Sequence, residues 1–183
     1  DKSTKQRFHL ILIAKNETGY KNLMYLSSMS YIEGFYYYPR INKKILKEHS
    51  EGLVCSSACL QGEVSWHLNL SERNVKFGAK GYERAKEVAL EYKGIFGDDF
   101  YLEIMRHGIG DQRRIDDDIL RIAKETGIKV IATNDTHYTF KERAAAHEVF
   151  MCIAMNKLLD DPNRLRHSVH EFYVKTPAQM SEL

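Results

Sequence analysis

Short apolar runs recur along the chain and predict strands. They lie at residues 8–14, 52–57, 100–105 and 128–132, and each is short enough for a buried strand. Glycine or polar turn residues bound most of these runs, as is usual for strands that cross a core. A last run at residues 171–174 has the same character. The pattern therefore predicts five short strands.

Between these runs, apolar residues recur at helical spacing. The clearest helix is expected at residues 111–126, where isoleucines three or four positions apart form an apolar stripe. Gly127 follows at a position typical of a helix C-terminus. Asn42 is a candidate helix cap, and Thr176 followed by Pro177 has the pattern of another helix start. The remaining helices are expected at residues 18–29, 41–49, 62–70, 81–92 and 141–155.

The alternation of strands and helices predicts an α/β fold with parallel strands in one domain over residues 1–183. In such folds, ligands bind beyond the carboxyl ends of the strands. The residues that directly follow each predicted strand are therefore the first place to look for chemistry.

Potential metal ligands follow three of the predicted strands. Cys59 comes after the second strand, His107 after the third, and Asp135 and His137 after the fourth. Residues two apart in an extended segment point the same way, so Asp135 and His137 can converge on one ion. Thiolate, imidazole and carboxylate ligands together favour zinc, manganese or iron over magnesium or calcium.

Each of these residues also has a structural interpretation. Asp135 could cap the next helix, with His137 packed on the surface, and Cys59 could be a small buried apolar residue. His107 could be a partly exposed loop histidine. His9 begins its predicted strand, which in a parallel sheet is the wrong end for the ligand-binding edge, so its position alone favours a structural role.

The other histidines form no recognisable pattern. His147 lies on a predicted helix, where a core histidine with satisfied hydrogen bonds is the simpler interpretation. The histidines without interpretable spacing are His49, His67, His167 and His170.

Composition limits the classes of protein that remain. Apolar residues make up 43% of the chain and charged residues 28%, which is typical of a globular domain. The longest apolar run, residues 149–155, is too short to span a bilayer. The net charge of +2 is too balanced to predict nucleic-acid binding by itself. Three cysteines, an odd and low number, favour free thiols in a reducing compartment, so a cytoplasmic location is expected.

Several segments together resemble a known family. They begin with HLILIAKNETGYKNL from His9 and include GFYY, PRI, SACLQGE, ATNDTHY, LDDPNR and EFYVK, in this order. These segments resemble the PHP domain (polymerase and histidinol phosphatase domain) of bacterial DNA polymerase III alpha subunits. The resemblance covers nearly the whole chain and is more specific than any single motif.

The resemblance implies a distorted (β/α)7-type barrel that is incomplete at its N-terminus, because the His-x-His, Asp-His-Gly and Glu segments that open the family domain do not precede His9. The chain would be the C-terminal portion of the PHP domain, with the start of the following polymerase region near its end. In the family, a cleft holds up to three metal ions. Some members hydrolyse phosphodiester bonds there, and others have lost ligands and act as scaffolds.

Carried over by position, the resemblance implies five metal ligands. Asp135 and His137 match the last metal motif, Cys59 matches a position that is often His or Cys, and His9 matches the histidine that opens a His-Leu-x-x-x-Ala segment. His107 lies in a cleft segment and is the least secure of the five. Zinc or manganese is the expected ion, and no catalytic base can be named.

The implied function is that of a part of a replicative DNA polymerase, a nucleotidyltransferase whose PHP portion supports the polymerase and binds metals for 3′–5′ exonuclease or phosphoesterase activity. The alternative is a scaffold, or a docking module for a proofreading exonuclease, without catalysis of its own. A free-standing phosphatase is a third and weaker hypothesis. The expected partners are DNA and other replicase subunits, and no membrane.

Overall fold

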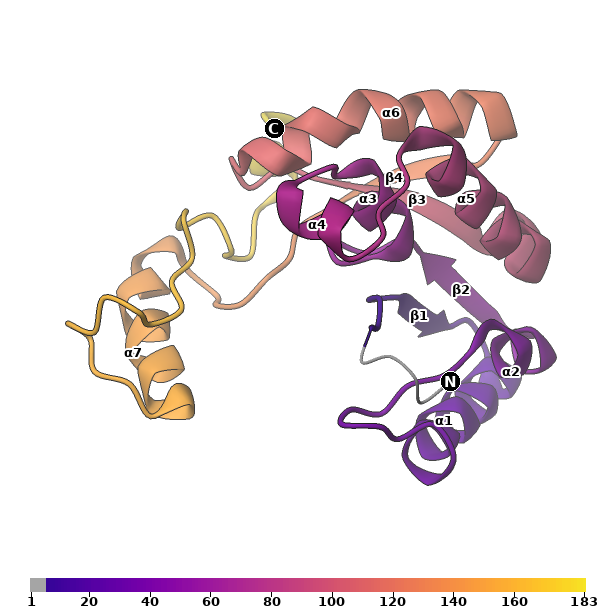
Figure 1. Cartoon of the computed structure of the whole chain (residues 1–183), viewed down its shortest axis with the longest axis horizontal. Coiled ribbons are helices and arrows are strands. Elements are labelled where there is room, and N and C mark those ends of the chain that lie inside the picture. The colour runs from indigo at the N-terminus through magenta and orange to yellow at the C-terminus, as the bar shows by residue number, and fades with distance from the viewer. Residues whose placement is uncertain (1–5) are drawn as a thin grey trace. The chain divides into compact units, whose positions relative to one another are not determined.

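The computed structural model describes residues 6–183 (Figure 1). These residues group into two compact units. Unit 1 contains the described residues up to Glu103 together with Ile115–Ile131. Unit 2 contains Ile104–Arg114 and Ala132–Leu183.

Four of the predicted strands form one open sheet in the order β1-β2-β3-β4. Their bounds are β1 Ile11–Ala14, β2 Leu53–Ser56, β3 Phe100–Met105 and β4 Lys129–Thr133. β2 and β3 are parallel, with Cys55 opposite Phe100. β1 and β2 are antiparallel, with Ile11 opposite Ser56 and Ala14 opposite Leu53. The α/β class is confirmed, but the prediction that all strands are parallel is wrong for β1.

The path of the chain between β1 and β2 explains this reversal. Helix α1 (Glu17–Ile32) leads away from the end of β1, and helix α2 (Lys43–Glu48) returns the chain to that same end. Asn16 caps α1, and its side chain accepts a hydrogen bond from the Gly19 N–H at 2.9 Å. Gly19 and Gly52 lie so close that a Cβ atom on Gly19 would stand 1.9 Å from the Gly52 carbonyl oxygen. This contact holds the start of α1 beside the start of β2.

Six further α-helices complete the described chain. They are α3 Glu63–Leu68, α4 Glu72–Lys76, α5 Tyr82–Phe96, α6 Gly110–Thr126, α7 Ala144–Met155 and α8 Pro177–Ser181. α4 was not expected from the sequence. The caps at Asn42 and Thr176 are confirmed, the latter with a capping box to Gln179. The strand predicted at residues 171–174 is wrong, because that segment forms only an isolated bridge between Tyr138 and Tyr173.

The core of unit 1 lies between the sheet and the helices that pack on it. Phe100 and Leu102 of β3 are almost completely buried, and Tyr92 of α5 stacks on Phe100 with 5.5 Å between the ring centroids. α3 packs against α5, and α5 contacts β2. β1 is less covered, since Ile13 is 59% exposed, so the interpretation of the first run as a fully buried strand is wrong on that face.

The barrel expected from the family resemblance is not confirmed, because the described residues form an open, mixed sheet. Four strands are also too few to close around a packed interior, which takes about eight in small barrels. Among the described helices, none is long and apolar enough to cross a membrane.

Candidate functional site

The reversed direction of β1 brings His9 to the loop that follows β2. The His9 N–H donates to the Gln61 carbonyl oxygen at 3.0 Å, and His9 forms a bridge with Gly62. Nδ1 of His9 lies 3.6 Å from Sγ of Cys59. The positional argument against His9 assumed parallel strands and is therefore wrong. Two of the five predicted ligands are in contact in unit 1.

A buried carboxylate shapes the loop that carries Cys59. Glu103 is 5% exposed, and its Oε2 accepts hydrogen bonds from the Ser56 hydroxyl at 2.6 Å and the Ala58 N–H at 2.9 Å. The Glu103 N–H in turn donates to Oγ of Ser57 at 2.9 Å. Ala58 has φ +61°, a left-handed conformation that is uncommon for a residue with a Cβ atom. The loop therefore holds a defined shape because β3 anchors it.

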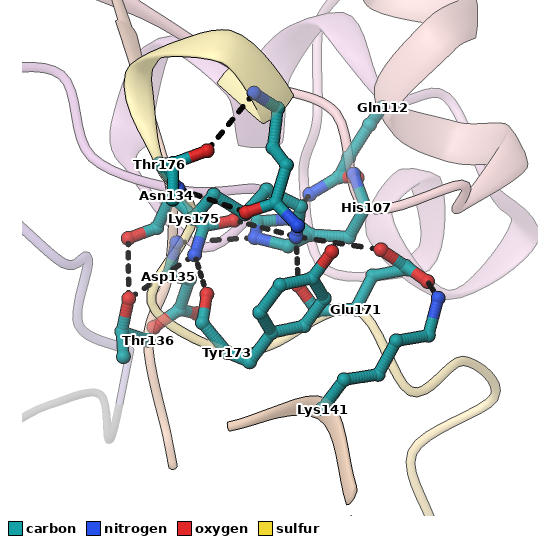
Figure 2. Close-up of polar contacts among 11 residues, drawn as sticks. His107, Gln112, Asn134, Asp135, Thr136, Lys141, Glu171, Tyr173, Lys175 and Thr176 are labelled. Carbon is teal, nitrogen blue, oxygen red and sulfur yellow. Dashed lines mark hydrogen bonds and ion pairs between the residues drawn. The ribbon is translucent and has the colours of Figure 1, made fainter. Parts of the chain in front are cut away.

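In unit 2, Asp135 and His137 lie on the loop after β4. Polar contacts of Asn134 and Asp135 fix that loop (Figure 2). The Asn134 amide donates to the Tyr173 carbonyl oxygen at 2.6 Å. Its side-chain oxygen accepts from the ammonium group of Lys175 at 3.3 Å, and the Lys175 side chain is 2% exposed. The segment that carries the predicted Asp-x-His pair is thus tied to the segment around Lys175.

His107 is buried in unit 2 with both ring nitrogens near polar atoms (Figure 2). Its Nε2 accepts a hydrogen bond from the Asp135 N–H at 3.1 Å, and its Nδ1 lies 3.0 Å from Nε2 of Gln112. Burial is the main cause that lowers the pKa of His107, and the nearby Lys175 ammonium group is the second. A lowered pKa agrees with a neutral ring that accepts a hydrogen bond from the Asp135 N–H. This geometry favours a residue that positions the Asp135 loop, and the metal role of His107 stays a prediction.

His137 belongs to a cluster of three histidines in unit 2. Its partners are His147 of α7 and His167, and each residue offers one ligand atom within 4.8 Å of the others. Oδ1 of Asp135 lies 3.3 Å from Nε2 of His137. Burial lowers the pKa of His147 and of His167. The His137 imidazole lowers both pKa values further, and His147 also lowers the pKa of His167. Neutral imidazole is the form that binds a metal.

The sequence interpretation missed His147 and His167. His147 was interpreted as a core histidine, and His167 carried no recognisable spacing. His147 follows His137 by ten residues, and His167 follows His147 by twenty. No short metal motif has that spacing. Only the folding of α7 and the segment after it brings the three rings together.

A cavity in unit 1 is separate from the contact between His9 and Cys59. It has a volume of about 660 Å³ and lies between β1, α1 and α2, lined by residues such as Leu12, Leu26, Leu46 and Lys43. Neither His9 nor Cys59 lines it. Its wall mixes apolar and polar side chains and contains no histidine, cysteine or aspartate. The contact of His9 with Cys59 and that of Asp135 with His137 are therefore the better candidates for metal binding.

Comparison with known proteins gives the family. The family model described as "PHP domain" matches residues 1–107. DNA polymerase III subunit alpha of Campylobacter jejuni is 79% identical over the whole chain, that of Helicobacter pylori strain 26695 is 66% identical, and that of Borreliella burgdorferi is 45% identical over 98% of the chain. The chain spans about 15% of the length of each of these relatives.

The family model covers more than half of the chain, and it includes the contact between His9 and Cys59. The loop with Asp135 and His137 lies beyond it, within the region that the relatives share. The chain therefore belongs to the PHP domain family and matches DNA polymerase III alpha subunits along its whole length.

Proposed function

We propose that this chain is the metal-binding PHP portion of a replicative DNA polymerase alpha subunit, and that in the intact protein it hydrolyses phosphodiester bonds at the 3′ end of DNA. The polymerase activity itself, a nucleotidyl transfer, would belong to parts of the parent protein outside these 183 residues. The contact between His9 and Cys59, built by the reversed β1, is the observation that carries the metal role.

The proposed ligands fit a transition metal. His9 and Cys59 offer an imidazole and a thiol in contact in unit 1, and Asp135 and His137 offer a carboxylate and an imidazole 3.3 Å apart in unit 2. This mixture of donors suits zinc or manganese better than calcium. A bound ion would supply an activated water and stabilise negative charge on the phosphate.

The residues of this chain have separate tasks in this proposal. His9, Cys59, Asp135 and His137 hold the ions, and His107 holds the Asp135 loop through its backbone. Glu103 fixes the loop of Cys59. The open sheet would be part of a barrel that other strands of the parent protein complete, and the partners would be DNA, the other replicase subunits and a proofreading exonuclease in the cytoplasm.

The test is an Asp135→Asn substitution in the intact parent protein. The change removes the carboxylate charge and leaves the backbone N–H that donates a hydrogen bond to His107. Metal content is measured by mass spectrometry, and 3′ exonuclease activity is measured on a labelled primer. Changing groups near a bound metal costs about 10–100-fold in affinity or activity, so the loss of a direct ligand should reach at least about 100-fold.

Asp117→Asn on the exposed side of α6 is the matched control and should leave both the metal content and the exonuclease activity unchanged. Equal metal content and equal exonuclease activity in Asp135→Asn and the parent protein would refute the metal role of Asp135. Retained metal without exonuclease activity in the unsubstituted protein would favour the scaffold alternative instead.

A further inference from the structure

Three imidazoles from three separate segments converge in unit 2. His137 lies on the loop after β4, His147 on the first half of α7, and His167 on the irregular segment between α7 and α8. The ring centroids are 5.5 Å apart for His137 and His147, 5.1 Å for His137 and His167, and 5.5 Å for His147 and His167. No two of these histidines are neighbours in the sequence, so the fold alone creates the cluster.

Hydrogen bonds and ion pairs hold the three segments in this arrangement. The His137 N–H donates to the Phe172 carbonyl oxygen at 2.8 Å, which joins the first segment to the third. Glu148, the neighbour of His147, accepts from Arg164 at 2.6 Å, and the Arg164 side chain is only 6% exposed. The polar groups beside the cluster thus fix the backbone on which each imidazole stands, as the supporting residues of metal ligands do.

The ring of Phe172 closes the apolar side of the cluster. Its centroid lies 4.5 Å from that of His167 and 5.3 Å from that of His137. Phe172 is 5% exposed, so it limits the access of water from that side. Asp135 brings a carboxylate oxygen to 3.3 Å from Nε2 of His137. Three imidazoles with one carboxylate beside them form a set of donors that suits zinc and its first-row neighbours.

We propose that His137, His147 and His167 form a binding site for one divalent transition-metal ion of the zinc class. Zinc–nitrogen distances of about 2.0–2.1 Å place the nitrogens of a tetrahedral site roughly 3.3–3.4 Å apart. The ligand atoms here lie within 4.8 Å of one another, so each pair needs to approach by at most about 1.5 Å to reach that spacing. The bound ion would crosslink the loop after β4, α7 and the segment that follows α7.

This site goes beyond the proposed function, although the two share His137 and the neighbouring Asp135 carboxylate. His147 and His167 have no part in the phosphoesterase proposal, and His9 and Cys59 have no part in the three-histidine site. Substitutions at His147 and His167 therefore test the new site, whereas Asp135→Asn and the exonuclease assay test the proposed function.

The first experiment measures zinc binding by the intact parent protein. After chelator treatment, Zn²⁺ is added, and the bound zinc is counted by mass spectrometry for His147→Gln and His167→Gln. Each should bind one zinc ion fewer per chain than the unsubstituted protein. The control is His170→Gln, since His170 lies on the same segment, 57% exposed and outside the cluster, and should bind as much zinc as the unsubstituted protein.

A second experiment requires no substitution. Diethyl pyrocarbonate modifies free imidazoles, and peptide mass spectrometry reports the extent of modification at each histidine. Zn²⁺ should reduce the modification of His147 and His167 together by at least tenfold and leave His170 unchanged, and Mg²⁺ should have no effect. Equal modification of His147 and His167 with and without Zn²⁺, or an unchanged zinc count in both variants, would overturn the proposal.

Discussion

The buried carboxylate of Glu103 offers the sharpest test of how this chain builds its site. It accepts two hydrogen bonds, one from the Ser56 hydroxyl and one from the Ala58 N–H, and it is 5% exposed. Hydrogen bonds to a charged group contribute about 1.5–3 kcal/mol each, so the pair contributes about 3–6 kcal/mol. Glu103→Ala removes the one carboxylate oxygen that accepts both hydrogen bonds and leaves two buried donors without their partner.

We expect Glu103→Ala to lower the free energy of unfolding by about 4 kcal/mol, near the middle of that range. Glu103→Gln keeps one oxygen that can accept both hydrogen bonds, and neutral hydrogen bonds contribute about 0.5–1.5 kcal/mol each, so the loss should be only about 2 kcal/mol. Because Ala58 has φ +61°, the loop should also lose its shape first at this residue.

Urea unfolding followed by circular dichroism measures both losses, and hydrogen exchange at the Ala58 amide reports the loop. Glu87→Ala is the matched control, because the Glu87 side chain is 65% exposed and its ion pair with Arg84 lies at the surface. Its effect should stay within about 0.5 kcal/mol. A loss below about 1 kcal/mol in Glu103→Ala, or equal losses in the Gln and Ala variants, would refute the assigned role of the carboxylate.

Three further predictions concern residues on the helices of unit 1. Gly19→Ala should destabilise the chain by about 3 kcal/mol, because its Cβ atom would stand 1.9 Å from the backbone oxygen of Gly52. Gly94→Ala on α5 meets no atom within 4 Å and should stabilise by roughly 0.5–1 kcal/mol, so equal unfolding midpoints in urea would contradict the packing argument. Hydrogen bonds from Lys86, and to a smaller extent from Arg121, lower the pKa of the Glu125 carboxyl group from 4.5 to about 2. The contribution of these bonds to the stability of the folded chain should therefore be complete above pH 4.5 and disappear as the pH falls toward 2. Carboxyl NMR titration checks this value, and an apparent pKa near 4.5 for Glu125 would contradict it.

Much of the secondary structure could be predicted from local patterns. β3 begins and ends where its apolar run does, and α6 begins one residue before the predicted range and ends with it, followed by Gly127 at φ +66°. The Asn42 side chain accepts hydrogen bonds from two N–H groups of α2, as its position predicted. These features depend on residues within one or two turns of each other, so a sequence pattern is enough to find them.

The failures concern segments whose structure depends on distant partners. Residues 171–174 have the composition of a strand, but hydrogen bonds to the loop after β4 leave only a bridge at Tyr173. The short helix α4, which Ser71 caps, has no buried residue and therefore no apolar stripe for the pattern to show. In both segments, tertiary contacts decide the outcome more than the local propensity does.

The sequence by itself determined the α/β class, the positions of the four sheet strands along the chain and the Asp135-x-His137 pair after the fourth strand. Only the tertiary structure decided that β1 runs against β2, which places His9 against Cys59. The tertiary structure alone also gathers His147 and His167 around His137. The physical reason is that periodicity and caps act within a few residues, whereas the direction of a strand and the meeting of side chains depend on the whole path of the chain between them.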